Sequence, residues 1–340
     1  MTQSTGFRRL ALIATVLAFG VVMLGAYVRL NDAGLGCPDW PGCYGHVVVP
    51  EHPDAMAAAD AAYPQNPVQP AKGWKEMTHR YVAGTLGLLV LALAVWSVLA
   101  RRRTGHLARL PLVLLGVIIF QALLGMWTVT WKLKPIVVMA HLLGGMTTLA
   151  LLWWLTMSRL PGFSRLRLPR VRGLRVALAL GLALVIGQIA LGGWTSANYA
   201  ALACNEFPTC TRGQWWPPTD FSEAFVLWRG IGPNYEYGVL DQPARIAIHL
   251  THRMGALVVT TFLLGLAIAL WRAVPGRVAS GSALAVFLAL AAQVSLGIAN
   301  VVFSLPLPVA VAHNAGAAIL LLTLVTVNYL ARNEPADEHV

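Results

Sequence analysis

Long apolar runs dominate the pattern of hydrophobic and polar positions along this chain. Eight of them are long enough to cross a bilayer as helices, at about 10–30, 77–100, 110–130, 136–158, 174–197, 246–271, 278–303 and 306–330. Arg8 and Arg9 before the first run are also typical of a signal peptide, but its apolar stretch is too long and no small-residue cleavage site follows closely. The pattern predicts an all-α membrane protein with eight transmembrane helices.

The composition agrees with this prediction and excludes two other classes of protein. Apolar residues make up 57% of the 340 residues and charged residues 11%, with a mean hydropathy of +0.64, which is too little charge to cover a soluble surface. The net charge of +11 is typical of nucleic-acid-binding proteins as well. The basic residues border the apolar runs, however, and are not interleaved with aromatic residues. We expect contact with membrane lipid and none with nucleic acid.

The basic residues also predict the orientation of the chain. The N-terminus, 101–109, 159–175, 271–277 and the C-terminal tail together carry 15 Lys and Arg residues, against 10 on the opposite side with its longer loops. Under the positive-inside rule, both termini are therefore cytoplasmic. The long loops at about 31–75 and 198–245 then face outward.

All four cysteines lie in the two outer loops, in matched segments. These read Cys-Pro-Asp-Trp-Pro-Gly-Cys from Cys37 to Cys43 and Cys-Asn-Glu-Phe-Pro-Thr-Cys from Cys204 to Cys210. An even number of cysteines on the outer side predicts two local disulfides, Cys37–Cys43 and Cys204–Cys210. Four free thiols and a zinc site are the alternatives, although structural zinc sites usually have closer cysteine spacings and further Cys or His ligands.

The chain is also an internal duplication. Glu-Met-Thr-His-Arg at 76–80 matches His-Leu-Thr-His-Arg at 249–253, and Gln121…Gly125 matches Gln293…Gly297, at an offset of 172–173 residues. Each half has four spans, so the two halves lie parallel in the membrane. The predicted organisation is an N-terminal four-helix half at 1–160, a cytoplasmic linker at 161–173, a C-terminal four-helix half at 174–331 and a tail at 332–340.

Gln188…Gly192 repeats the spacing of glutamine and glycine once more. Residues four apart share one face of a helix. The glycines are interpreted as helix-packing positions. For the glutamines, packing and a functional role both remain open.

Four histidines occupy matched positions near the outer ends of the even-numbered spans: His79, His141, His252 and His313. Polar residues inside a membrane are costly and usually functional, although hydrogen bonding between packed helices is the alternative. A catalytic zinc or copper ion would gather several ligands around one site. Paired histidines on facing helices, each followed one turn later by small residues, favour one bis-histidine heme in each half.

The sequence resembles the heme A synthase family from the first span to the last. Four segments carry the resemblance: Gly-Ala-Tyr-Val-Arg-Leu-Asn-Asp-Ala-Gly-Leu-Gly-Cys-Pro-Asp-Trp-Pro-Gly-Cys at 25–43, Glu-Met-Thr-His-Arg at 76–80, Gln-Ala-Leu-Leu-Gly-Met-Trp-Thr-Val at 121–129 and His-Leu-Thr-His-Arg at 249–253. The resemblance implies an eight-helix, parallel-duplicated oxidoreductase of a bacterial-type inner membrane. Such an enzyme oxidises the C8 methyl group of heme O to the formyl group of heme A, for terminal cytochrome oxidase. Heme O synthase, oxidase assembly factors and an electron acceptor of unspecified kind are the partners it implies.

The resemblance also implies roles for individual residues. His252 and His313 match the axial ligands of a resident heme b, and His79 and His141 match those of the half that receives the substrate heme. Glu76 matches an acidic residue essential for catalysis, and both cysteine pairs match disulfides of the outer loops. The heme sites are then expected near the outer face of the membrane.

The duplication shows how the two halves differ. Glu76 and His249 are equivalent, each one turn before an axial histidine, so a carboxylate occurs in one half only. A carboxylate there can accept a proton or stabilise positive charge at the methyl carbon. His249 is expected to bond a propionate or solvent and not to be a fifth ligand. Arg80 and Arg253 are expected either to contact heme propionates or to anchor the helices at the interface.

Two other functions fit part of the pattern. A diheme b-type electron-transfer protein linked to quinone would use the same four histidines, but it gives no reason for Glu76 in one half only. A parallel-repeat transporter predicts charged or helix-breaking residues near the midplane. The polar residues here gather instead at the outer ends of the spans.

Overall fold

The computed structural model describes residues 5–104, 109–169 and 173–332, and within them every regular element is a helix. Eight of these helices are long and apolar enough to cross a membrane, which confirms the predicted all-α membrane fold. They are α1 (Thr5–Leu30), α3 (Pro70–Thr104), α4 (Arg109–Thr130), α5 (Pro135–Arg159), α7 (Leu174–Ala197), α9 (Gln242–Ala273), α10 (Arg277–Val302) and α11 (Leu307–Leu330).

Three of the spanning helices begin earlier than the apolar pattern predicts, and one of them is α1, which begins at Thr5. The other two are α3, which begins at Pro70, and α9, which begins at Gln242, next to Pro243. Proline is favoured in the first turn, where its missing N–H costs no hydrogen bond, so α3 and α9 extend into polar sequence of the outer loops. As a result, Glu76 lies inside a helix, as His249 does.

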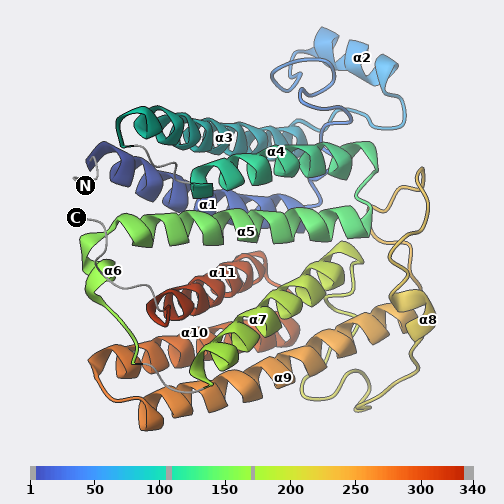
Figure 1. Ribbon diagram of the computed structural model, residues 1–340. Helices are drawn as coiled ribbons and strands as arrows, with labels where there is room; N and C mark the ends of the chain where they lie inside the picture. The colour runs from blue at the N-terminus through green and yellow to red at the C-terminus, as the bar shows by residue number, and fades with distance from the viewer. Residues whose placement is uncertain (1–4, 105–108, 170–172, 333–340) are drawn as a thin grey trace.

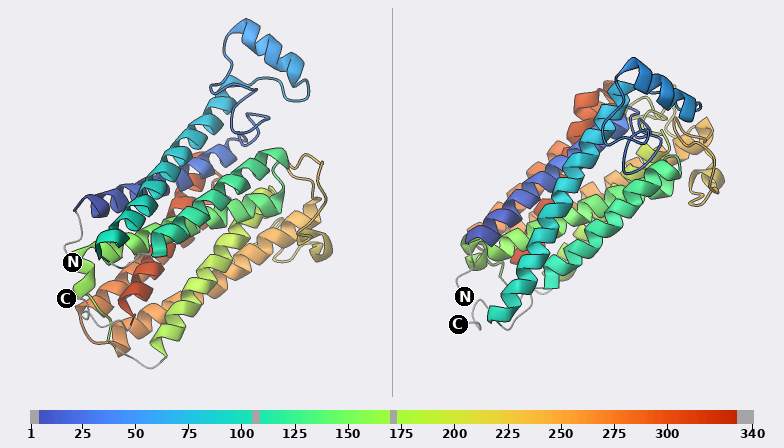
Figure 2. Two further views of the ribbon diagram at one scale, coloured as in Figure 1. Left: turned by 45° about the horizontal axis from the view of Figure 1, so that its top comes forward. Right: turned by 90° about the horizontal axis from the view of Figure 1, so that it is seen from above.

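Within the described residues, three short helices lie between the spans and are not evident from the apolar pattern. α2 (Pro53–Ala62) and α8 (Phe221–Ala224) belong to the two outer loops, and α6 (Pro161–Arg165) belongs to the linker. Figure 2 shows α2 standing beyond the outer end of α3, away from the bundle.

The spanning helices form two rings of four. In the N-terminal half, α1 packs against α3 and α5, and α4 packs between α3 and α5. In the C-terminal half, α7 packs against α9 and α11, and α10 packs between α9 and α11. The same order of packing in each half fits the predicted duplication. The rings join where α5 contacts α7 and where α11 contacts α1 and α5.

The two ends of the bundle differ. The start of α1 and the end of α11 lie together at one end, and α2 and α8 lie at the other (Figure 1). At the first end, Leu168 of the linker donates its N–H to the Leu330 carbonyl, and Arg175 donates to the Ala331 carbonyl. Of the predicted linker and tail, 170–172 and 333–340 lie outside the described residues.

The hydrophobic core fills the half of the bundle opposite the outer loops. One continuous cluster runs from Ala11 and Ala14 of α1 through Leu149 and Leu152 of α5 to Leu324 of α11. Two smaller clusters lie under the outer loops, one around each cysteine pair. The histidines lie between the large core and these loop clusters.

Candidate functional site

The structure places the four predicted histidines in two facing pairs. His79 of α3 faces His141 of α5, and His252 of α9 faces His313 of α11, each pair being close enough for an electrostatic interaction. Each ring of helices therefore contains one pair.

A glycine of the neighbouring helix packs against each imidazole. An ideal Cβ built on Gly25, Gly125, Gly192 or Gly297 would lie 3.1, 3.4, 3.2 or 3.1 Å from Cε1 of His79, His141, His252 or His313, respectively. At Gly25, Gly192 and Gly297 the distance is tighter than an ordinary Cβ contact, and at Gly125 it is an ordinary van der Waals contact. Each glycine therefore packs against an imidazole ring, which for Gly125, Gly192 and Gly297 is the packing role predicted from the sequence.

Three of the four histidines also contact a glutamine four residues before that glycine. The amide of Gln121 donates to the His141 carbonyl at 2.9 Å. Gln188 donates to the His252 carbonyl at 2.9 Å and lies 3.1 Å from its Nδ1. Gln293 lies 3.4 Å from Nε2 of His313. The role that the sequence left open for the glutamines is therefore to hold the histidines in place.

The burial pattern around the histidines fits a flat prosthetic group. Five stretches include the positions that face the histidines, and they contain no buried residue: 19–27, 138–145, 251–258, 291–299 and 311–315. Three of the imidazoles, those of His79, His141 and His313, have a buried Nδ1 without a hydrogen-bond partner. Across the described parts of the chain, no three His, Cys, Asp or Glu side chains gather as ligands for a bare metal ion. The donor set suits two bis-histidine hemes.

Glu76 is buried at the outer end of the N-terminal ring. Its Oε2 accepts the backbone N–H of Cys37 at 2.9 Å, and its Oε1 pairs with Arg80 at 2.5 Å. The carboxylate lies on α3 one turn before His79, so both side chains are on the same helix face. It is thus tied both to the first cysteine of the outer loop and to the cation next to the histidine.

His249 repeats one of these contacts in the C-terminal ring. It is buried to a similar degree, and its Nδ1 accepts the backbone N–H of Cys204 at 3.2 Å. The two halves therefore share the bond between the helix and the cysteine loop. They differ in that only Glu76 adds a carboxylate and an ion pair.

Arg80 and Arg253 are bound to the outer loops. Arg80 donates to backbone carbonyls of residues 39, 41 and 42 as well as to Glu76. Arg253 donates to the carbonyls of residues 204, 206 and 209. By these contacts each arginine holds the cysteine loop of its own half. The two roles expected from the sequence, propionate binding and interface anchoring, do not account for them.

The outer loops contain the two predicted disulfides, Cys37–Cys43 and Cys204–Cys210, and no described cysteine is free. This excludes the free-thiol and zinc alternatives. A carboxylate inside each loop holds the following turn: Asp39 accepts the N–H groups of Tyr44 and Gly45, and Glu206 those of Arg212 and Gly213. The matched positions of these acids, two residues after the first cysteine of each segment, are the signal for these turns in the sequence.

Two side chains of the outer loops have shifted pKa values, those of Tyr44 and Glu206. Burial, helped by the nearby carboxylates of Asp60, Glu76 and Asp39, raises the pKa of Tyr44 to about 12. Its hydroxyl therefore stays protonated and donates to the Asn66 carbonyl. The N–H of Gly213, followed by the Thr209 hydroxyl, lowers the pKa of Glu206, which keeps this acid ionised in its turn.

The two halves meet close to the histidines. An ideal Cβ on Gly193 of α7 would lie 3.0 Å from Leu142 and 3.4 Å from Met139, which flank His141 on α5. The preceding residue, Gly192, packs against His252. Gly192 and Gly193 therefore bring α7 close both to His252 and to the part of α5 that contains His141.

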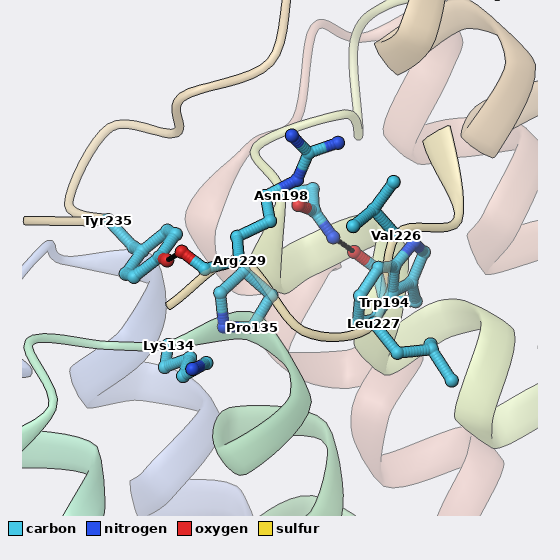
Figure 3. A pocket seen from close by; sticks show the side chains of 8 residues that line it. All are labelled: Lys134, Pro135, Trp194, Asn198, Val226, Leu227, Arg229 and Tyr235. Atoms are coloured by element: carbon cyan, nitrogen blue, oxygen red, sulfur yellow. Dashed lines mark hydrogen bonds between the residues drawn. The ribbon is translucent and has the colours of Figure 1, made fainter. Parts of the chain in front are cut away.

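A small pocket in the second outer loop contains none of the four histidines (Figure 3). Lys134, at the start of α5, is buried there, donates to the Gly230 carbonyl at 2.5 Å and lies 3.2 Å from the ring centroid of Trp228. Tyr235 donates to the Arg229 carbonyl at 2.8 Å. The contacts of Lys134 fasten the loop to α5, and no pattern in the sequence indicates them.

Comparison with known proteins agrees with these features. Residues 8–325 match the COX15-CtaA family, described as cytochrome oxidase assembly protein. The chain is 48% identical over 327 residues to the heme A synthase of Shewanella oneidensis, with 96% of each protein covered. It is 28% identical to the heme A synthases of a Chelativorans species, over 90% of this chain and 85% of that protein, and of Paracoccus denitrificans, over 93% and 85%. Because the family match reaches into all eight spanning helices and includes both histidine pairs, this chain belongs to the COX15-CtaA family of cytochrome oxidase assembly proteins.

Proposed function

We propose that this chain is a heme A synthase, a membrane oxidoreductase that converts the C8 methyl group of heme O into the formyl group of heme A for terminal cytochrome oxidase. The N-terminal ring holds the substrate heme between His79 and His141. The C-terminal ring holds a resident heme b between His252 and His313. The two facing histidine pairs support both sites, as do the glycines that pack against the four imidazoles.

The placement of Glu76 is the observation that carries the proposal. Oxidising a methyl carbon releases protons together with electrons, so the site needs a group that accepts protons. Among the described acidic residues, Glu76 is the one buried beside a histidine pair, one turn from His79. The Cys37 N–H and Arg80 orient its carboxylate before substrate arrives, which is the preorganisation that electrostatic catalysis requires.

The contact between α5 and α7 supports electron transfer between the halves. Heme b, when bound, would supply a one-electron relay beside the substrate half, and the electrons would pass on to the external acceptor that the family resemblance implies. The chain contributes a close approach of the two halves, because Gly192 and Gly193 let α7 approach both His252 and the helix that carries His141. The cysteine loops are tied to α3 and α9 next to the histidines, through Glu76 and Arg80 in one half and through His249 and Arg253 in the other.

The orientation of the molecule follows from the same proposal. Both termini are cytoplasmic, and the heme sites lie near the outer face of the inner membrane, below the two disulfide loops. Heme O synthase, which would deliver the substrate, and oxidase assembly factors, which would receive the product, are the expected partners.

A diheme electron-transfer protein is the competing function, and heme analysis distinguishes the two. The full chain is expressed in a host that makes heme O but no heme A, and extracted hemes are separated by chromatography. A heme A synthase yields heme A together with heme b, whereas an electron carrier yields heme b alone. Absence of heme A from a well-folded preparation that contains heme b would contradict the proposed function.

A further inference from the structure

Each cysteine loop exposes a group of large apolar side chains, which we call the apolar tip. One member stands before the proline inside the disulfide, and the other two closely follow the left-handed turn at Tyr44-Gly45 or Arg212-Gly213. The tips are Trp40, Val47 and Val48 in the first outer loop and Phe207, Trp215 and Trp216 in the second. Their exposed fractions run from 39% for Trp40 to 79% for Val47. Both halves therefore expose large apolar residues at matched positions.

In the first outer loop this exposure is confined to the tip. The structure describes all of 31–69, and no other large apolar side chain is exposed there. α2, which stands away from the bundle (Figure 2), exposes small or acidic residues instead: Pro53, Asp54, Ala57, Ala58, Ala61 and Ala62. A group of exposed large apolar side chains marks a surface that contacts a partner, so the tip and not the loop as a whole is such a surface.

The spans beside the loops give the level of the tips relative to the membrane. α3 contains no charged residue from Tyr81 to Ala100, and α9 contains none from Met254 to Trp271. The hydrocarbon core of a bilayer requires about 20 apolar residues of a helix. Its outer boundary therefore lies close to Tyr81 and Met254.

The first cysteine loop is bound to α3 at this boundary. Tyr81 donates its hydroxyl to the Val47 carbonyl. Arg80, the last charged residue before the boundary, donates to the carbonyls of the two neighbours of Trp40. All members of the tip belong to the segment that these bonds hold, so the tip lies at the level of the lipid headgroups.

The same contact places the tip on the lipid side of α3. Tyr81 is 44% exposed, and Leu88 and Val95 continue its stripe of exposed side chains at intervals of two helical turns. The exposed stripe of a membrane-spanning helix faces lipid. Val47, bonded to Tyr81, is therefore at the outer end of a lipid-facing surface.

The second cysteine loop is attached to α9 in the same way. Arg253 donates to the carbonyls of Glu206 and Thr209, on either side of Phe207 and its proline. Met254, the next residue, is 50% exposed and begins the charge-free stretch of α9. The second tip thus has the same relation to its span as the first.

The charges of the loops favour lipid at the tips. The acids inside the disulfides, Asp39 and Glu206, accept N–H groups of the turns that follow them. The exposed polar neighbours of the tips include His46 and Arg212, and a cation at this level is attracted to anionic phospholipid. Aromatic and aliphatic side chains at the boundary between headgroups and acyl chains are typical of membrane anchors.

We propose that both apolar tips insert into the bilayer surface next to the cysteine loops, with their side chains among the headgroups and the upper acyl chains. The first cysteine of each loop bonds Glu76 or His249, so lipid contact supports the loops that hold these two side chains. The inference goes beyond the proposed function and does not depend on it.

The test is photo-crosslinking of the purified full chain in nanodiscs of phosphatidylethanolamine and phosphatidylglycerol. p-Benzoylphenylalanine, which reacts with neighbouring C–H bonds under illumination, is introduced singly at Val47 or at Trp215. Peptide mass spectrometry identifies the adducts. We expect phospholipid adducts at both positions.

Two further positions are matched controls. Leu88, 67% exposed on the lipid-facing stripe of α3, should give phospholipid adducts at a similar yield. Ala57, exposed on α2 of the same outer loop, should give none above background. No lipid adduct at Val47 or Trp215 while Leu88 is labelled would overturn the inference. Adducts with another protein in place of lipid, in membranes of the native host, would overturn it as well and assign the tips to a protein partner.

A second measurement needs no unnatural residue. The tryptophan emission that is lost in the double variant Trp215→Phe with Trp216→Phe belongs to the second tip. In the unmodified chain this part of the emission should be quenched by phospholipids brominated in the upper acyl chain and protected from iodide in the water. The opposite pattern would contradict insertion. Both measurements proceed without bound heme or turnover, so their outcome is independent of whether the chain makes heme A.

Discussion

Glu76 and His249 show how one residue separates two otherwise similar sites. Both are buried one turn before a histidine, and both accept the backbone N–H of the first cysteine in the overlying loop. Anchoring the loop is therefore a task common to the two positions. The negative charge of Glu76 and its pairing with Arg80 are what the N-terminal half has in addition.

Replacement of Glu76 by Gln tests this charge. The amide oxygen can still accept the Cys37 N–H, so we expect the fold and both hemes to be retained. Conversion of heme O should fall by about 10²–10⁴-fold or more, the usual contribution of a general base. Heme O, partly oxidised intermediates and heme A are quantified by chromatography of extracted hemes.

The control is His249→Gln, which makes the equivalent change in the other half. It should cost far less heme A, because a site that only retains a cofactor needs no proton acceptor. Near-normal heme A from Glu76→Gln, or an equal collapse from His249→Gln, would place the chemistry on another residue.

At the scale of helices, α9 carries two glycines in very different surroundings. A Cβ on Gly255 would lie 2.3 Å from Oε1 of Gln188, whereas a Cβ on Gly265 would meet nothing within 4 Å. The first glycine leaves room for the Gln188 amide that bonds the His252 carbonyl, and the second is an exposed position of the same helix.

Substitution of each glycine by alanine separates the effect of the Gln188 contact from that of the helix. Gly255→Ala should displace Gln188 from His252, destabilise the protein by about 1–3 kcal/mol, the typical cost of overpacking, and lower the amount of heme b that copurifies. Gly265→Ala should leave both properties unchanged or slightly improved, since alanine is the better helix former. Pyridine hemochrome spectra and thermal unfolding of the two variants measure the difference. Equal heme content in both would show that the contact between Gln188 and His252 contributes nothing to heme retention.

At the scale of the whole molecule, the two rings are separate binding units joined at α5, α7, α1 and α11. Each histidine pair is contained in one ring, so under the proposed function neither heme site needs ligands from both halves. The halves can therefore be disabled one at a time.

Alanine substitution of the histidines tests the assignment of the halves. His252→Ala or His313→Ala should lose the resident heme b. His79→Ala or His141→Ala should retain heme b but fail to process heme O. Heme content of the purified variants gives the answer, and loss of all heme from His79→Ala with none from His252→Ala would reverse the assignment.

Much of the architecture was predictable because it depends on local sequence. A span needs a long apolar stretch wherever it occurs, and a tandem duplication repeats its residues in order, so the eight helices, the paired histidines and the two disulfides could be read from spacing alone. The starts of α1, α3 and α9 were missed because their first turns are polar, and those of α3 and α9 are set by Pro70 and Pro243.

Tertiary structure decided which partner each polar side chain takes. Gln121, Gln188 and Gln293 share one spacing with their glycines, and that spacing is equally compatible with plain helix packing. Arg80 and Arg253 could reach several acceptors, and the folded loops offer their own carbonyls. Gly25 is an ordinary small residue within its span. Its contact with His79 appears only in the folded structure, because contacts between helices far apart in the chain are fixed by packing and not by local sequence.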